Sequence, residues 1–140
     1  MRSLSIPVLL ALLVSLALPS AVGAATYKGK ATNMDRDFKY GKVTVRTKGA
    51  KVTYIEIQSV TTSGCNGNMT IVFAPKDPET QITKGSARIK NGRLSVTYRP
   101  VRSIEDQTTK ISARITGSKV TGTFESGGLC VNEGRFTAKR

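Results

Sequence analysis

Histidine and tryptophan are absent from this sequence of 140 residues. Without histidine, the chain has no Ser-His or Cys-His pair for ordinary nucleophilic catalysis and no imidazole ligand for a metal ion. It also contains neither the Ser-x-x-Lys pattern of acylating serine enzymes nor the Gly-x-x-x-x-Gly-Lys loop that binds phosphates. We therefore expect a noncatalytic protein that needs no cofactor and no metal ion.

Acidic residues are few, since nine Asp and Glu stand against 22 Lys and Arg, for a formal net charge of +13. Two carboxylates are enough for glycoside hydrolysis, but most of the nine lie in predicted turns or at outward strand positions. Asn33, Asp35 and Asp37 alternate as in a calcium loop, yet Phe38 and Thr44 stand where that loop needs glycine and glutamate. We predict a polar turn at this place.

The first 24 residues have the three parts of a signal peptide. Arg2 supplies the positive start, Ile6–Leu18 is apolar, and Val22-Gly23-Ala24 offers small residues at a cleavage site. A membrane-spanning helix needs about 20 apolar residues, and this run is shorter and is interrupted at Pro7. We expect cleavage after Ala24 and a secreted or periplasmic protein that does not span a membrane.

Only two cysteines are present, Cys65 and Cys130. An even number of cysteines in a small exported domain favours a disulfide, and no histidine is available to activate a thiol. A bridge between them would close a loop of about 65 residues, worth about 4 kcal/mol in the chain-entropy model. We predict one structural disulfide.

Removal of residues 1–24 takes away a single cation, Arg2, and leaves a formal charge of +12. Such an excess favours anionic partners: acidic polysaccharides, phosphate-bearing envelope polymers, anionic lipid surfaces or nucleic acid. Export separates the protein from most nucleic acid, and exposed aromatic side chains for base stacking are not evident, so we do not expect nucleic-acid binding. In the alternative interpretation, the charge serves solubility alone.

Two stretches of alternating apolar residues predict β-hairpins. In Gly85–Arg99, Asn91-Gly92 is typical of a type I′ turn, and in Lys110–Glu125, Gly117-Ser118 is typical of a type II′ turn. Counting outward from the first turn places Ile89 opposite Leu94, Ala87 opposite Val96 and Gly85 opposite Tyr98, with Tyr98 pointing inward. Counting from the second pairs Ile115 with Val120, Ala113 with Gly122, Ile111 with Phe124, Ser112 with Thr123 and Lys110 with Glu125.

Weaker signals predict further short strands, bounded by glycine, asparagine and proline. About nine strands within residues 25–140 indicate a single all-β domain. We expect an antiparallel β-sandwich, with a small β-barrel as the alternative. The weaker strands are Thr26–Ala31, Lys42–Arg46, Val52–Val60, Met69–Ala74 and Arg135–Lys139, with Phe136 and Ala138 on one face.

The end of the chain carries a recurring pattern: Val120-Thr121-Gly122-Thr123-Phe124, then Cys130, then Phe136-Thr137-Ala138-Lys139-Arg140. In this it resembles an uncharacterised family of small exported bacterial all-β proteins with a Gly-x-Phe hairpin, a late cysteine and an aromatic-Thr-Ala C-terminus. The resemblance implies export, the disulfide and the fold class. It implies no active site and no ligand.

The strongest candidate site is the outward face of the first predicted hairpin. Directly opposed like charges are unfavourable there, so an anionic partner would relieve them, and arginine grips carboxylate, sulfate or phosphate with two hydrogen bonds. We expect a noncatalytic module for an anionic envelope or extracellular polymer. The alternative is an exported structural or protein-interaction domain, such as an inhibitor or assembly subunit. The candidate anion-binding residues are Lys84, Arg88, Lys90, Arg93 and Arg99, with Lys90 opposite Arg93 and Lys84 opposite Arg99.

Overall fold

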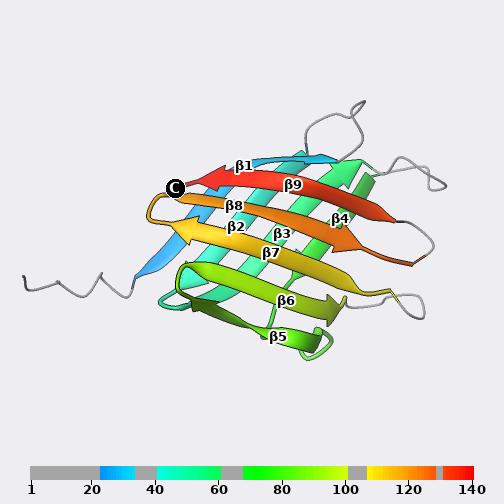
Figure 1. Cartoon of the computed structure of the whole chain (residues 1–140), viewed down its shortest axis with the longest axis horizontal. Coiled ribbons are helices and arrows are strands. Elements are labelled where there is room, and N and C mark those ends of the chain that lie inside the picture. The colour runs from blue at the N-terminus through cyan, green and yellow to red at the C-terminus, as the bar shows by residue number, and fades with distance from the viewer. Residues whose placement is uncertain (1–22, 34–40, 61–67, 101–106, 129–130) are drawn as a thin grey trace, which may run out of the picture.

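The computed structural model describes residues 23–33, 41–60, 68–100, 107–128 and 131–140 (Figure 1). These residues form nine β-strands and no helix, which confirms the all-β prediction. The strands are β1 (Ala24–Asn33), β2 (Gly41–Lys48), β3 (Lys51–Val60), β4 (Asn68–Phe73), β5 (Gln81–Lys90), β6 (Arg93–Arg99), β7 (Thr109–Thr116), β8 (Lys119–Ser126) and β9 (Asn132–Lys139).

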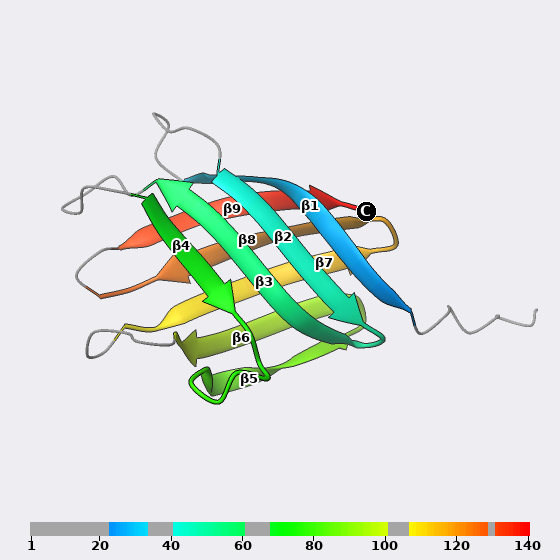
Figure 2. The same ribbon diagram turned by 180° about the vertical axis from the view of Figure 1, so that it is seen from behind.

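The strands form one antiparallel sheet that closes on itself. Eight of them make the ring, in the order β2-β1-β9-β8-β7-β6-β5-β3, and β3 returns to β2. The ninth strand, β4, pairs with β3 over Ile55–Val60, while β5 reaches β3 only at Lys51, through Arg88. Figure 2 shows β1 to β4 crossing in front of β5 to β9.

The architecture is therefore the closed barrel, and the sandwich that the sequence favoured is not what the chain forms. A sandwich keeps two sheets apart, whereas here β1 pairs with β9 from Lys28 to Asn33 and β3 pairs with β5 at Lys51. Both closing pairings join residues that are distant in the sequence. Alternation along a single strand carries no information about such partners.

The second hairpin has the register that its turn predicts. Ile115 pairs with Val120 and Ile111 with Phe124, and the intervening pairs follow the same count down to Lys110 with Glu125. Gly117 has a positive φ of 54°, as the first position of a type II′ turn requires. A short turn between two regular strands is enough to set this register.

The first hairpin follows its predicted register only beside the turn, where Asn91 and Gly92 have the positive φ of a type I′ turn and Lys90 pairs with Arg93. Farther out the prediction is wrong, because two irregularities interrupt β5. Thr83 is an extra residue, and Ala87–Ile89 leave β6 to meet β3, so that the Ile89 amide donates to the carbonyl of Ala50 at 2.8 Å. Gly85 consequently pairs with Val96.

Side chains fill the interior of the barrel, as is usual for eight strands. Tyr98 points inward as predicted, and its ring packs on Phe73 with centroids 4.8 Å apart. Phe136 and Ala138 share the inner face as their spacing predicts. The buried hydrophobic residues are Tyr27, Ala31, Val43, Val45, Val52, Ile55, Ile57, Ile71, Phe73, Leu94, Val96, Tyr98, Ile111, Ala113, Val120, Phe124, Phe136 and Ala138.

The two ends of the barrel differ. One end carries the tight turns at residues 49–50, 91–92 and 117–118, and the strands at the other end lead into segments outside the described residues (Figure 1). The predicted disulfide partners, Cys65 and Cys130, lie outside the described residues, as do the Asp35–Asp37 loop and residues 1–22 of the predicted signal peptide. The strand ends that flank the cysteines, at residues 60 and 68 and at 126 and 132, lie at this same end of the barrel.

Candidate anion-binding surface

All five cations of the predicted site are exposed on β5 and β6. Lys90 lies opposite Arg93, as predicted. The other predicted pair is wrong, because the irregularity at Ala87–Ile89 shifts Lys84 to a position opposite Thr97. The extra residue Thr83 adds to this shift, so that Arg99 stands opposite Gln81. Arg88 turns toward β3, where its cross-strand partner is another cation, Lys51.

A hollow of about 370 Å³ brings three of the five cations together, and we call it the β5–β6 hollow. Arg88, Lys90 and Arg93 line it together with Ser86 and Ser95, which are direct cross-strand partners. The irregular part of β5 shapes this hollow, and the Arg88 amide there donates to the Ser86 hydroxyl at 3.3 Å. Lys84 and Arg99 lie outside its lining.

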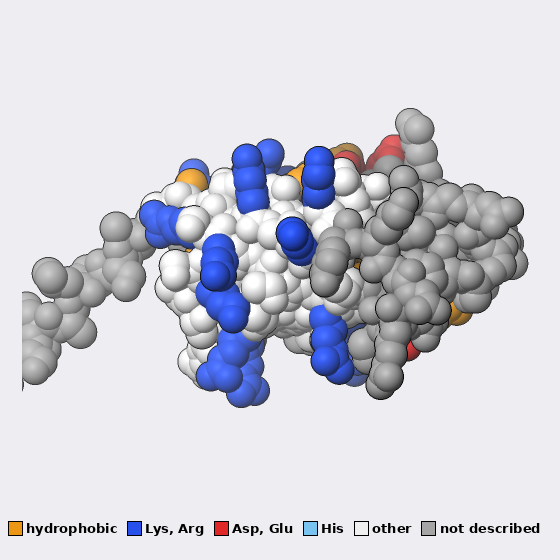
Figure 3. Space-filling view, turned by 90° about the horizontal axis from the view of Figure 1, so that it is seen from above, with side chains coloured by type: hydrophobic (Ala, Val, Ile, Leu, Met, Phe, Trp, Pro, Cys, Tyr) orange, Lys and Arg blue, Asp and Glu red, His pale blue; other side chains and the backbone are white. Residues whose placement is uncertain are grey.

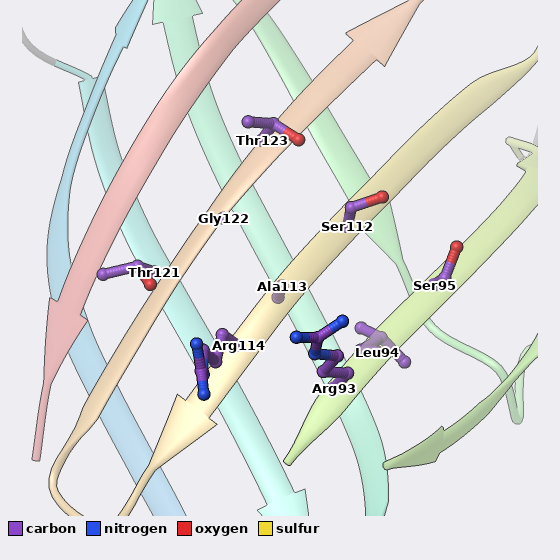
Figure 4. A pocket seen from close by; sticks show the side chains of 9 residues that line it. All are labelled: Arg93, Leu94, Ser95, Ser112, Ala113, Arg114, Thr121, Gly122 and Thr123. Atoms are coloured by element: carbon purple, nitrogen blue, oxygen red, sulfur yellow. The ribbon is translucent and has the colours of Figure 1, made fainter. Parts of the chain in front are cut away.

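A second hollow of about 560 Å³ adjoins the first across β6, and we call it the β6–β8 hollow. Arg93 and Ser95 line both hollows, so the two form one continuous surface. Figure 4 shows Arg93 and Arg114 at one end of the second hollow, with Ser95, Ser112 and Thr123 toward the other.

Small residues keep the β6–β8 hollow open. Ala113 and Gly122, a direct cross-strand pair, belong to its lining, and the outward positions other than Arg93 and Arg114 hold serine or threonine. Gly122 cannot become larger, because a Cβ atom there would lie 2.5 Å from the Phe136 ring on the inner side.

Arg114 is a member of this surface that sequence reasoning missed. It is exposed and stands directly opposite Arg93, across the pairing of β6 with β7. The predicted register of the second hairpin already places Arg114 on the outer face, opposite Thr121. The missing information was that β7 follows β6 in the sheet.

The lining of the two hollows has the side chains that bind anions in other proteins. It combines Arg88, Lys90, Arg93 and Arg114 with hydroxyl donors and contains no carboxylate. Guanidinium groups bind carboxylate, sulfate and phosphate through paired hydrogen bonds, and serine and threonine add single ones. Figure 3, a view over another side of the barrel, shows Lys and Arg spread across it and Asp and Glu only near one end.

The outer face of β2 and β3 differs from this surface at Arg46, which lies over an aromatic ring whose hydroxyl is bonded to a carboxylate. The Arg46 guanidinium lies 5.0 Å from the centre of the Tyr54 ring, and the Tyr54 hydroxyl donates to Glu56 at 2.6 Å. That hydrogen bond and burial raise the pKa of Tyr54. A cation beside a carboxylate and an aromatic ring has less need of an external anion.

Two carboxylates do face each other elsewhere, on Glu125 of β8 and Glu133 of β9. The hollow beside them holds about 140 Å³, well below the roughly 300–1,000 Å³ of typical ligand pockets. Both residues are exposed, and Lys110 pairs with Glu125 from the other side. This pair is a weak basis for hydrolysis, which requires an enclosed substrate between the carboxylates.

Comparisons with known proteins supply no further identification. No protein-family model matches this sequence, and no curated protein or solved structure matches it either. Within the part of the chain that the structure describes, no cluster of three or more His, Cys, Asp or Glu is placed to hold a metal ion. The same residues include no helix long and apolar enough to cross a bilayer.

Proposed function

We propose that this protein is an exported, noncatalytic binding domain for an anionic polymer of the envelope or the extracellular medium. The observation that carries the proposal is the position of Arg93, which lines both hollows and lies between Lys90 and Arg114 on the neighbouring strands. Like charges in direct cross-strand positions destabilise a sheet. A bound polyanion offsets that repulsion.

The shape of the surface also suits a polymer better than a small molecule. The two hollows are open and lie side by side across β5 to β8, and neither encloses a ligand as a deep pocket does. Their hydroxyl groups, on Ser86, Ser95 and Ser112 among others, are placed to bond the uncharged parts of a polysaccharide. Lys84 and Arg99 flank this surface and add long-range attraction.

Export and the disulfide belong to this proposal. The signal-like start of the sequence and the resemblance to small exported proteins support a secreted or periplasmic location. A disulfide between Cys65 and Cys130 is supported by the strand ends on either side of each cysteine, which lie at one end of the barrel.

The experiment that tests the function measures binding of the purified protein to polygalacturonate and to neutral dextran over a series of salt concentrations. We expect binding to polygalacturonate alone, weakening steeply as salt rises because the contacts are exposed ion pairs. Arg88→Gln/Arg93→Gln should weaken it by about tenfold or more, since each substitution removes a charge-assisted contact. The control Lys76→Gln/Lys110→Gln removes the same charge away from both hollows.

Equal weakening in the two double variants would mean that net charge alone, and not this surface, attracts the polymer. Absence of binding to polyanions at low salt would overturn the proposal. In that event the alternative, a structural or protein-interaction domain, becomes the better account, because packed protein interfaces depend less on salt.

A further inference from the structure

The cations of the proposed site belong to a longer arrangement on the barrel wall. Lys90, Arg93 and Arg114 are direct cross-strand partners on β5, β6 and β7. A second triplet, Lys119, Lys139 and Lys28, is formed in the same way by β8, β9 and β1. All six side chains are exposed.

The two triplets adjoin each other. Arg114 pairs with Thr121, and Lys119 stands two residues from Thr121 on the same outer face of β8. Diagonal neighbours of this kind lie about 7–8 Å apart. The six residues, which we call the cation band, therefore place one cation on each of six consecutive strands, over roughly 24 Å at about 4.8 Å per strand.

We infer that the ligand of this protein is a linear anionic polysaccharide that lies across the strands along the cation band. The inference rests on the proposed function and extends its contacts from the two hollows to Lys119, Lys139 and Lys28. One cation per strand matches a chain that carries its negative groups at regular intervals. Thr121 and Thr137, which lie beside the band on β8 and β9, offer hydroxyl groups to the same chain.

The carboxylates of β8 and β9 lie far along the strands from the cation band, and this distance favours one direction for a bound polyanion. Glu125 and Glu133 stand six residues from Lys119 and Lys139, on β8 and β9 respectively, which is roughly 20 Å along a strand. A polyanion that ran parallel to these strands would meet both carboxylates. One that crosses the strands near the turns meets cations alone.

A polysaccharide fits the band better than a single-stranded nucleic acid. Bases bind by stacking on aromatic side chains, and the described aromatic residues of β1, β6, β8 and β9 are buried in the barrel: Tyr27, Tyr98, Phe124 and Phe136. Of the described aromatic side chains, Tyr54 alone is on the outer wall, on β3, where Arg46 lies over its ring.

Length dependence tests this inference. The probes are galacturonate oligomers of increasing length, polygalacturonate, and a single-stranded deoxythymidine oligomer with the charge of the longest galacturonate oligomer. Affinity for galacturonates should rise with length until the oligomer spans the band and then change little. Lys119→Gln/Lys139→Gln should weaken binding of the long oligomers by about fivefold or more, but leave the shortest ones that bind unaffected. Lys76→Gln/Lys110→Gln serves again as the charge-matched control.

The outcomes separate this inference from the proposed function. If oligomers of every length bind the Lys119→Gln/Lys139→Gln variant as tightly as the unmodified protein, while Arg88→Gln/Arg93→Gln still weakens them, the hollows bind and the band does not. Stronger binding of the deoxythymidine oligomer than of galacturonate of equal charge would also overturn the inference. If no galacturonate binds at any length, the proposed function fails and the inference fails with it.

Discussion

Gly122 of β8 stands directly opposite Phe136 of β9, and a Cβ atom on this glycine would lie 2.5 Å from the Cζ atom of the ring. In the next pair that faces the interior the arrangement is reversed, because Phe124 of β8 lies opposite Gly134 of β9. A Cβ atom on Gly134 would lie 2.5 Å from the Cζ atom of the Phe124 ring. Two Gly-x-Phe segments thus pair head to tail. Each supplies the ring that covers the glycine of the other.

The first prediction follows from this pairing. Gly122→Ala should lower the free energy of unfolding by about 2 kcal/mol, because the added methyl group overpacks the interior. Gly127→Ala is the matched control, since the nearest atom to its Cβ would be 4.0 Å away, and it should change stability by less than about 0.5 kcal/mol. Denaturant unfolding measures both. Partial recovery in Gly122→Ala/Phe136→Leu would identify the ring as one cause, beside the Ser112 carbonyl oxygen, which would also lie 2.5 Å from the added methyl group. Similar losses in the two alanine variants would contradict the prediction.

The contrast between the two hairpins shows how much the sequence could predict. Lys110–Glu125 alternates without interruption, so the Gly117-Ser118 turn alone determined its register. In β5 the alternation of apolar residues also looks regular, yet Gly85 has a φ of 80°, and at Ala87–Ile89 the strand leaves β6, so that Arg88 pairs with Lys51 of β3. Such a departure is driven by a distant strand, and local pattern does not contain it.

The candidate site was predictable to the same degree. Lys90 and Arg93 flank a two-residue turn, so their apposition follows from local sequence. Arg114 joins them only because β7 lies beside β6, and Lys28 joins Lys139 only because β1 lies beside β9. Pairings between hairpins decide barrel closure and the course of the cation band alike, and both became apparent only from the assembled sheet.

Gly85 links the irregular backbone of β5 to the proposed site. A Cβ atom there would lie 2.2 Å from the carbonyl oxygen of Ser95, and its left-handed φ of 80° is costly for any residue other than glycine. Gly85→Ala should therefore lower stability by about 2 kcal/mol or more and weaken polygalacturonate binding, since Ser86 and Arg88 follow on the same segment. Gly117→Ala is the control.

That control shares the positive φ, at 54°, but has nothing within 4 Å of its added methyl group. It should cost about 1 kcal/mol and leave binding unchanged. Urea unfolding and a binding isotherm on the same samples distinguish the two variants. Unaltered binding by Gly85→Ala would show that the backbone at this glycine does not shape the β5–β6 hollow.

Tyr98 makes stability depend on alkaline pH. Burial raises its pKa, and the hydroxyl of its cross-strand partner Thr109 opposes this only in part. The folded protein holds the phenolic proton of Tyr98 more tightly than the unfolded chain does, and in the unfolded chain the pKa of tyrosine is about 10. The contribution of Tyr98 to the free energy of unfolding is therefore fully present below about pH 10. Stability is then lost as the pH rises through and above it.

Tyr98→Phe should accordingly reduce the decline in unfolding free energy between about pH 9 and pH 11. At neutral pH its effect should stay below about 1 kcal/mol, since Thr109 keeps its hydrogen bond of 3.1 Å with Ser126. Tyr54→Phe, on the outer wall, should leave most of the alkaline decline in place. Identical pH profiles for Tyr98→Phe and the unmodified protein would rule out Tyr98 as the source.

Arg114 provides the sharpest test of whether the binding surface extends beyond a single hairpin. Arg114 and Lys110 are both exposed cations on β7, but Arg114 stands opposite Arg93 whereas Lys110 stands opposite Thr97 and Glu125. Arg114→Gln should weaken polygalacturonate binding by about fivefold, because it removes a charge-assisted contact from the β6–β8 hollow. Lys110→Gln should change it by less than about twofold, because this lysine already lies beside a carboxylate. Arg114→Gln should also raise the thermal stability slightly, because it relieves the repulsion between Arg114 and Arg93. Weaker polygalacturonate binding together with higher stability in Arg114→Gln would indicate that Arg93 and Arg114 are held side by side for a ligand. Unchanged affinity in this variant would confine the site to β5 and β6.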